Sequence, residues 1–308
     1  MSSPTISTCR AWPSQSAALI LLVFIGMGCR PAGPAAVIPS VVATSDDAPT
    51  AAPSIESVTT GKSVSPVAGA RTRKLVIAMA SDLRFVAPEI QQEFELEAPD
   101  IALEPVFGSS GKLFAQISNQ APFDVFLSAD LQYPQQLAEQ GLAKQESLFR
   151  YATGHIVLWV RNDSPLAVAD QGAGILRHPQ FKKLAIANPR LAPYGRAAEA
   201  ALKTLGLYTE LQQKLVLGEN VAQAAQFAES GAADAAVIGL SFATAPEFAG
   251  RGKYWKFPPE LYPRIEQGGV ILEQSQNLEA AQTFCVFLQS TRAQLILKRY
   301  GFGLPEAP

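Results

Sequence analysis

The feature that most constrains the fold is a repeated alternation between short apolar runs and amphipathic stretches, which begins at Arg71. The first run, Leu75–Met79, has no polar residue on either face, so it predicts a strand that is buried on both sides. Strands that alternate with helical stretches in this way indicate parallel sheets covered by helices. The sequence therefore predicts an α/β fold.

The alternation falls into two series, which we interpret as two lobes of one domain at residues 71–308. The first lobe is predicted to contain about 71–154 and 268–308, and the second about 155–267. Each lobe is expected to be a mainly parallel sheet flanked by helices. Because ligands of open α/β sheets bind beyond the carboxyl ends of the strands, we expect a binding site in the cleft between the lobes.

The N-terminal part of the chain has a different pattern. Residues 1–29 resemble a secretory signal, in which Arg10 precedes the apolar run Ala17–Met27, which is too short to span a bilayer. This run leads into a segment similar to a bacterial lipobox, which predicts acylation of Cys29; an ordinary signal cleaved nearby is the alternative. Residues 30–70, rich in Pro, Ala and Ser and without periodicity, predict a disordered tether.

Charge and cysteine content narrow the function further. The net charge of −2 creates no field that would attract nucleic acid or an anionic membrane surface, so an anionic ligand must be held by local donors. Of the three cysteines, two lie within residues 1–29. Cys285 therefore has no disulfide partner in the predicted domain, and we expect a buried, unreactive thiol.

Four predicted strand-to-helix junctions carry groups that can donate hydrogen bonds to an anion. They are Ala80–Asp82, Phe107–Lys112, Ala187–Arg196 and Gly218–Val221. Each also has a plain structural interpretation as a helix cap or tight turn. The second junction is not a nucleotide-binding P-loop, because Val106 stands where that motif needs Gly and Leu113 where it needs Ser or Thr.

Groupings typical of catalysis are missing from the sequence. It has no His-x-Glu or Cys-x-x-Cys metal spacing and no Gly-x-Ser-x-Gly nucleophile turn. We therefore expect a protein that is not an enzyme and has no cofactor. An enzyme on a similar scaffold and a surface interaction module are weaker alternatives, the second because it would not need paired donor junctions.

The four junctions, in this order and approximate spacing, resemble those of the substrate-binding protein of bacterial molybdate ABC transporters. The resemblance covers about Lys74 to Pro305. Within this range, residues 122–130, 261–267 and 298–302 give further support. It implies a two-lobed periplasmic-binding fold of type II-like topology, with molybdate or tungstate in the cleft between the lobes. It also implies a monomer in the periplasm or at the cell surface that delivers its ligand to membrane permease and ATPase subunits.

The resemblance also implies the ligand-binding residues. The residues carried over from the family are Ser81, Ser110, Tyr194 and Val221. The last two are expected to act chiefly through backbone N–H groups, and the N–H of Asp82 is a weaker candidate. No metal is held directly, because molybdenum or tungsten enters only within the oxyanion. Some family members use a strand Tyr where this chain has Ile238, so the contact set differs in detail.

Another small oxyanion is the main alternative ligand. A site made only of donors suits an oxyanion without a proton, whereas monoprotonated phosphate also needs an acceptor. The carboxylate of Asp82 keeps phosphate open as a ligand, and sulfate differs from molybdate mainly in size. The sequence does not rank molybdate against tungstate, because the two ions are nearly equal in size.

Overall fold

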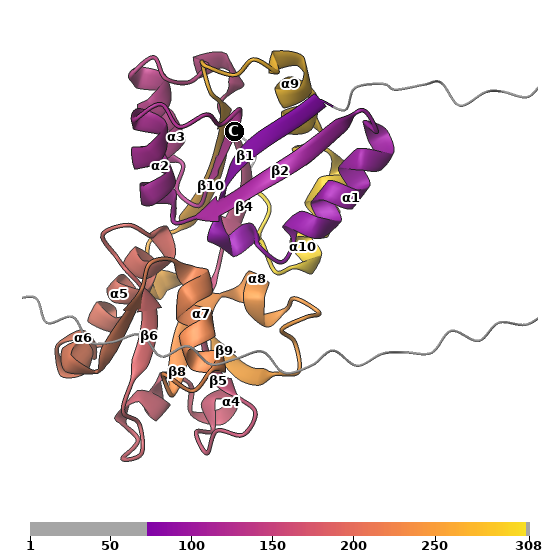
Figure 1. Cartoon of the computed structure of the whole chain (residues 1–308). Helices are drawn as coiled ribbons and strands as arrows, with labels where there is room; N and C mark the ends of the chain where they lie inside the picture. Colours follow the sequence, from indigo (N-terminus) through magenta and orange to yellow (C-terminus); the bar gives the residue numbers. More distant parts are fainter. Residues whose placement is uncertain (1–72, 306–308) are drawn as a thin grey trace, which may run out of the picture. The chain divides into compact units, whose positions relative to one another are not determined.

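The computed structural model describes residues 73–305, which form two α/β lobes, each built on a five-stranded sheet (Figure 1). The signal, Cys29 and the tether, which the sequence places within residues 1–70, lie outside the described residues. Within residues 73–305, no helix is long and apolar enough to cross a membrane. The α/β fold with two lobes is thus confirmed.

The first sheet has the strand order β2-β1-β3-β10-β4. Its strands are β1 (Arg73–Ala80), β2 (Ile101–Gly108), β3 (Val125–Ser128), β4 (Phe149–Gly154) and β10 (Ile265–Ile271). β1 pairs in parallel with β2 and β3, whereas β10 pairs antiparallel with β3 and β4. Four strands therefore run in one direction, and β10 alone is reversed.

The second sheet repeats this arrangement, with the order β7-β6-β8-β5-β9. Its strands are β5 (Ile156–Arg161), β6 (Leu184–Ala187), β7 (Leu215–Gly218), β8 (Ala235–Gly239) and β9 (Gly252–Lys256). β6 is parallel to β7 and β8, and β5 is antiparallel to β8 and β9. In both sheets the reversed strand is the one that the chain enters after crossing from the other lobe.

The two crossings lie next to each other. His155 joins β4 to β5, and residues 257–264 join β9 to β10. Ile265 pairs with Gly154, and Gln267 pairs with Ala152, so both belong to the first sheet. The sequence places the end of the second lobe at about residue 267, whereas β10 of the first sheet begins two residues earlier, at Ile265.

Helices cover both faces of the first sheet. They are α1 (Ala87–Glu97), α2 (Ser110–Ser118), α3 (Gln132–Glu139), α9 (Leu278–Leu288) and α10 (Thr291–Arg299), with the 3-10 turns η1 (Ser81–Leu83) and η2 (Gln145–Ser147). Figure 1 shows α2 and α3 on one face, and α1 and α10 on the other. Leu75 and Ile77 of β1 pack in the same core cluster as Phe94 of α1, while Ala78 packs with Leu113 of α2. β1 is thus buried on both faces, as predicted.

The second lobe has shorter helices and two long ones that follow strand ends. They are α4 (Val168–Gln171), α5 (Pro193–Thr204), α6 (Tyr208–Leu211), α7 (Val221–Glu229) and α8 (Leu240–Ala243), with η3 (Gly172–Arg177), η4 (Gln212–Lys214) and η5 (Pro259–Leu261). The start of α5 lies directly against the end of β6. A Cβ atom on Gly195 would lie 2.2 Å from the carbonyl oxygen of Ala187, so only glycine allows this approach.

We predict that Gly195→Ala destabilises the protein by about 3 kcal/mol, because a backbone atom cannot move aside as a side chain can. The measurement is urea unfolding followed by circular dichroism. Gly174→Ala is the matched control, since the nearest atom to its Cβ position is 3.8 Å away. Equal unfolding midpoints for the two variants would contradict this account of the α5 start.

Candidate functional site

The four strand-to-helix junctions meet where the two lobes face each other. η1 packs against α7. The N–H of Gly111, in the first turn of α2, donates to the carbonyl of Leu191, just before α5, at 2.9 Å. The ammonium of Lys112 pairs with Glu219, just before α7, at 2.6 Å. Each junction of the first lobe therefore contacts a junction of the second lobe.

The two serines carried over from the family lie at the ends of neighbouring strands. Ser81 opens η1 and is buried, but the N-cap of that turn is Ala80, so the structure gives Ser81 no capping role. Ser110 opens α2, and its Oγ accepts a hydrogen bond from the amide of Ala129 at 3.0 Å. Because this bond uses an oxygen lone pair, the hydroxyl proton of Ser110 remains available to donate.

The serine before Ser110 belongs with the candidate donors, although the sequence analysis did not select it. Ser109 is the N-cap of α2, but its hydroxyl makes no capping bond. Its Oγ is buried and has no hydrogen-bond partner among the described residues. A buried hydroxyl without a partner costs roughly 1–3 kcal/mol. The sequence signal was the pair of adjacent serines at the junction.

Tyr194 and Val221 lie in the first turns of the two helices that follow strand ends in the second lobe. Tyr194 follows Pro193 at the start of α5, and Val221 is the first residue of α7. The side chain of Asn220 caps α7 by accepting from the amide of Gln223 at 3.1 Å. First-turn amides have no acceptor within their own helix and carry partial positive charge. The backbone N–H groups of Tyr194 and Val221 are therefore candidates to donate to an anion.

A buried polar cluster joins the two lobes beside these amides. Asp82 is 1% exposed, and its Oδ2 accepts hydrogen bonds from Gln267 at 2.6 Å and from the Tyr194 hydroxyl at 3.1 Å. Its Oδ1 has no partner among the described residues. The Tyr194 hydroxyl is thus engaged with Asp82. Ile238, where some family members have Tyr, is fully buried in β8.

Burial sets the ionisation of this cluster. It raises the pKa of Asp82 from 3.8 to about 6, although hydrogen bonds from Gln267, from Tyr194 and from its own amide oppose the rise. Burial and the nearby charge of Asp82 also raise the pKa of the Tyr194 hydroxyl well above 10, so this hydroxyl stays protonated and donates. This cluster therefore contains neutral donors and one carboxyl group that ionises near neutral pH.

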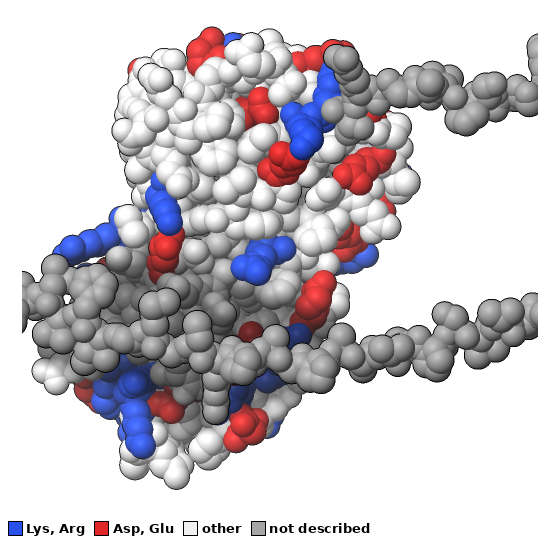
Figure 2. Space-filling view, viewed as in Figure 1, with Lys and Arg blue, Asp and Glu red and all other residues white. Residues whose placement is uncertain are grey.

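The described residues show no grouping for metal ligation, and the face seen in Figure 2 carries charges of both signs. Among residues 73–305, no three His, Cys, Asp or Glu side chains are grouped so that they could hold a metal ion. Figure 2 shows acidic and basic side chains interspersed on the visible face. Cys285 is buried, and burial raises the pKa of its thiol to about 12.

Comparison with known proteins identifies the family. Residues 75–303 match the model of a family described as bacterial extracellular solute-binding protein. The chain belongs to this family. The family resemblance seen in the sequence is confirmed. The activity that the description of this family names is solute binding.

Individual relatives of this solute-binding protein are named for molybdate. The molybdate-binding protein ModA of Azotobacter vinelandii is 37% identical over 235 residues, which cover 76% of this chain and 92% of the relative. ModA of Rhodobacter capsulatus is 36% identical, with coverage of 74% and 88%. The solved structure of the periplasmic molybdate-binding protein of Azotobacter vinelandii has a TM-score of 0.71 and 32% identity, and it covers 75% of this chain and all of its own.

The raised pKa of Asp82 generates a prediction about stability. Because the folded state holds the proton of Asp82 more tightly than the unfolded state, this group stabilises the protein at pH below about 4, and the contribution is lost as the pH rises through about 6. Asp82→Asn keeps an acceptor for Tyr194 and Gln267 but cannot ionise. We expect it to raise the stability at pH 7.5 by about 3 kcal/mol, and to change it little at pH 4.

Melting temperatures of the ligand-free protein between pH 4 and pH 8 measure this effect. Asp124→Asn is the matched control, because both carboxylate oxygens of Asp124 accept hydrogen bonds, from Val76 and from Ser275. That variant should melt at a lower temperature at neutral pH. If Asp82→Asn also has a lower melting temperature than the wild type at pH 7.5, burial of the ionised Asp82 carboxylate does not destabilise the protein.

Proposed function

We propose that this protein captures molybdate outside the cytoplasm and delivers it to an ABC importer. The residues proposed to bind the anion are Ser81, Ser110, Tyr194 and Val221. Ser109 is added to them, and the N–H of Asp82 is a weaker candidate. The protein binds its ligand as a monomer, without cofactor and without chemical change. Its partners are the permease and ATPase subunits of the importer.

The observation that carries the proposal is the meeting of the four junctions, two from each lobe, with hydroxyls and first-turn amides. A dianion that leaves water loses a large solvation energy, and fixed N–H and O–H dipoles can replace it. Helix N-termini add positive potential without a counter-ion. The molybdate-binding relatives, two of them above 35% identity, support molybdate as the ion.

Tungstate belongs to the same proposal, because its size and charge are nearly those of molybdate. Neutral donors at fixed positions cannot discriminate between molybdate and tungstate by charge, because both ions are dianions. Discrimination by size would require the site to distinguish two almost equal radii. We therefore expect similar affinities for both ions. Sulfate has the same charge but is smaller, so it should leave longer hydrogen bonds and bind more weakly.

Phosphate is the second candidate ligand, and one observation favours it. The Oδ1 of Asp82 is buried and has no hydrogen-bond partner within residues 73–305, and an ionised carboxylate can accept a hydrogen bond from the hydroxyl of a monoprotonated oxyanion. Asp82→Asn separates the two candidates, because the charge that it removes opposes molybdate but would accept a hydrogen bond from the phosphate hydroxyl. At pH 7.5 this variant should bind molybdate more tightly than the wild type, whereas a phosphate-binding protein should lose affinity for phosphate.

Titration calorimetry with molybdate, tungstate, sulfate and phosphate tests the proposal. We expect Ser81→Ala and Ser110→Ala each to weaken molybdate binding by roughly ten- to a hundredfold, since each removes one donor to a charged group. Ligand-free melting temperatures serve as the control for folding. Wild-type affinity in both variants would place the ligand elsewhere, and tighter binding of phosphate or sulfate would reject molybdate as the ligand.

We also propose that Cys29 is acylated and anchors the protein to a membrane. The support is the short apolar run before Cys29 and the similarity of this segment to a lipobox. We expect the full-length protein to fractionate with membranes and Cys29→Ala to be released or misprocessed. Mass spectrometry of the mature N-terminus decides, because an unmodified terminus at another residue excludes the anchor.

A further inference from the structure

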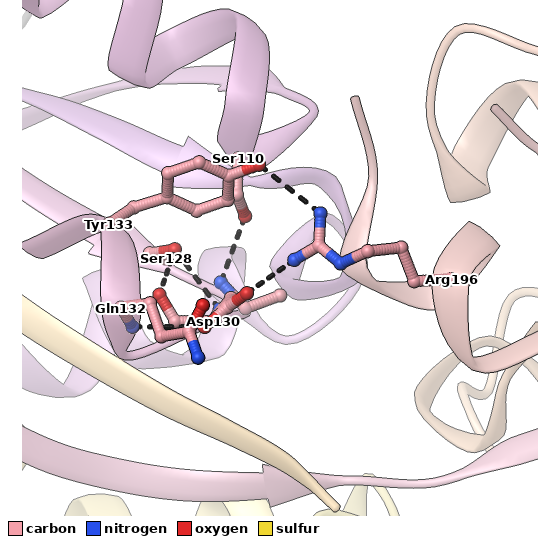
Figure 3. A network of polar contacts seen from close by, with 7 residues as sticks. Ser110, Ser128, Asp130, Gln132, Tyr133 and Arg196 are labelled. Atoms are coloured by element: carbon pink, nitrogen blue, oxygen red, sulfur yellow. Dashed lines mark hydrogen bonds and ion pairs between the residues drawn. The ribbon is translucent and has the colours of Figure 1, made fainter. Parts of the chain in front are cut away.

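A side chain of the second lobe contacts the residues that follow β3, one of which, Ala129, donates a hydrogen bond to Ser110 (Figure 3). Arg196 lies in α5, two residues after Tyr194, and its guanidinium forms an ion pair with the carboxylate of Asp130. It also donates to the hydroxyl of Tyr133 at 3.2 Å and lies 5.6 Å from the centre of that ring. Both partners belong to the first lobe, so these contacts link the lobes.

The strand end that receives Arg196 is held in place by several hydrogen bonds. Oδ1 of Asp130 accepts from the amide of Gln132 at 2.9 Å, and the amide of Asp130 donates to the hydroxyl oxygen of Ser128 at 3.0 Å. The amide of Ala129, between them, donates to Oγ of Ser110 at 3.0 Å. A short segment, residues 128–130, therefore connects the guanidinium of Arg196 to the hydroxyl of Ser110.

The contact needs a close approach of the lobes. A Cβ atom on Gly111, in the first lobe, would lie 2.7 Å from the carbonyl oxygen of Leu191, in the second lobe. The side chains of Arg196 and Asp130 are 40% and 22% exposed, so the pair lies at the rim of the interface and is partly shielded from water. Rotation of the lobes apart would separate these groups, because they lie on different lobes.

We propose that Arg196 is a positioning residue that couples closure of the lobes to the anion site, acting through Asp130 and Ala129 on the hydroxyl of Ser110. This inference rests on the proposed function, because it assigns Ser110 to the ligand. Arginine suits the role, since its guanidinium contacts Asp130 and Tyr133 at once. When Arg196 docks, it fixes the segment whose Ala129 amide orients Ser110 as a donor.

A second ion pair between the lobes provides the matched control. Lys112 and Glu219 also join the first lobe to the second, at 2.6 Å, and their side chains are 49% and 43% exposed. Within residues 73–305, neither side chain forms a hydrogen bond or an ion pair with residues 128–130. Loss of this pair removes an attraction between the lobes without disturbing the support of Ser110.

The test is a double-mutant cycle read by calorimetric titration of the full chain with molybdate, sulfate and phosphate. Arg196→Gln should weaken molybdate binding about tenfold in the wild-type background and less than about threefold when Ser110 is already alanine. Lys112→Gln should have the same small effect in both backgrounds. Arg196→Lys, which keeps the charge but cannot contact both partners, should fall between the wild type and Arg196→Gln.

The outcomes separate this inference from the proposed function. If the wild type binds sulfate or phosphate instead of molybdate, the proposed ligand is wrong, and the same cycle is read with the anion that binds. If Arg196→Gln weakens binding equally with and without Ser110, Arg196 does not act through that hydroxyl. If ligand-free Arg196→Gln melts several degrees below Lys112→Gln, its role is general stability, which also overturns the inference.

Discussion

The pairing of β4 with β10 is the constraint on which the arrangement of the lobes depends. The register sets Ile265 opposite Gly154, so the two chain segments that cross between the lobes lie side by side. β4 pairs only with β10 among the described strands, so the first sheet is complete only after the chain returns from the second lobe. Two adjacent crossings form a narrow connection between the lobes, and such a connection favours rotation of one lobe against the other.

A buried polar cluster lies beside the candidate donors. Asp82, Tyr194 and Gln267 come from η1, α5 and β10, and their hydrogen bonds tie η1 and α5 to the returning strand β10. The donors at the site are neutral, which lets them surround an anion without internal repulsion. Asp82 is the exception among these groups, because burial raises the pKa of its carboxyl group, and its ionisation at neutral pH therefore opposes folding.

Much of this arrangement could be predicted from the sequence, because apolar strands and strand-end motifs are local signals. Leu75–Met79 and the four junctions were recognised from a few adjacent residues each. β9 (Gly252–Lys256) was missed because it is short, partly exposed and carries two lysines. The contacts of Tyr194 with Asp82 and of Arg196 with Asp130 span 112 and 66 residues, so no local pattern could reveal them.

The tight approach at Gly111 has a consequence for how such proteins diversify. At this point the approach of the lobes requires glycine, because a Cβ atom on Gly111 would lie 2.7 Å from the carbonyl oxygen of Leu191. A larger side chain would hold the lobes further apart without replacing any candidate donor. Substitution there offers a route by which descendants of this chain could come to accept ions of another radius.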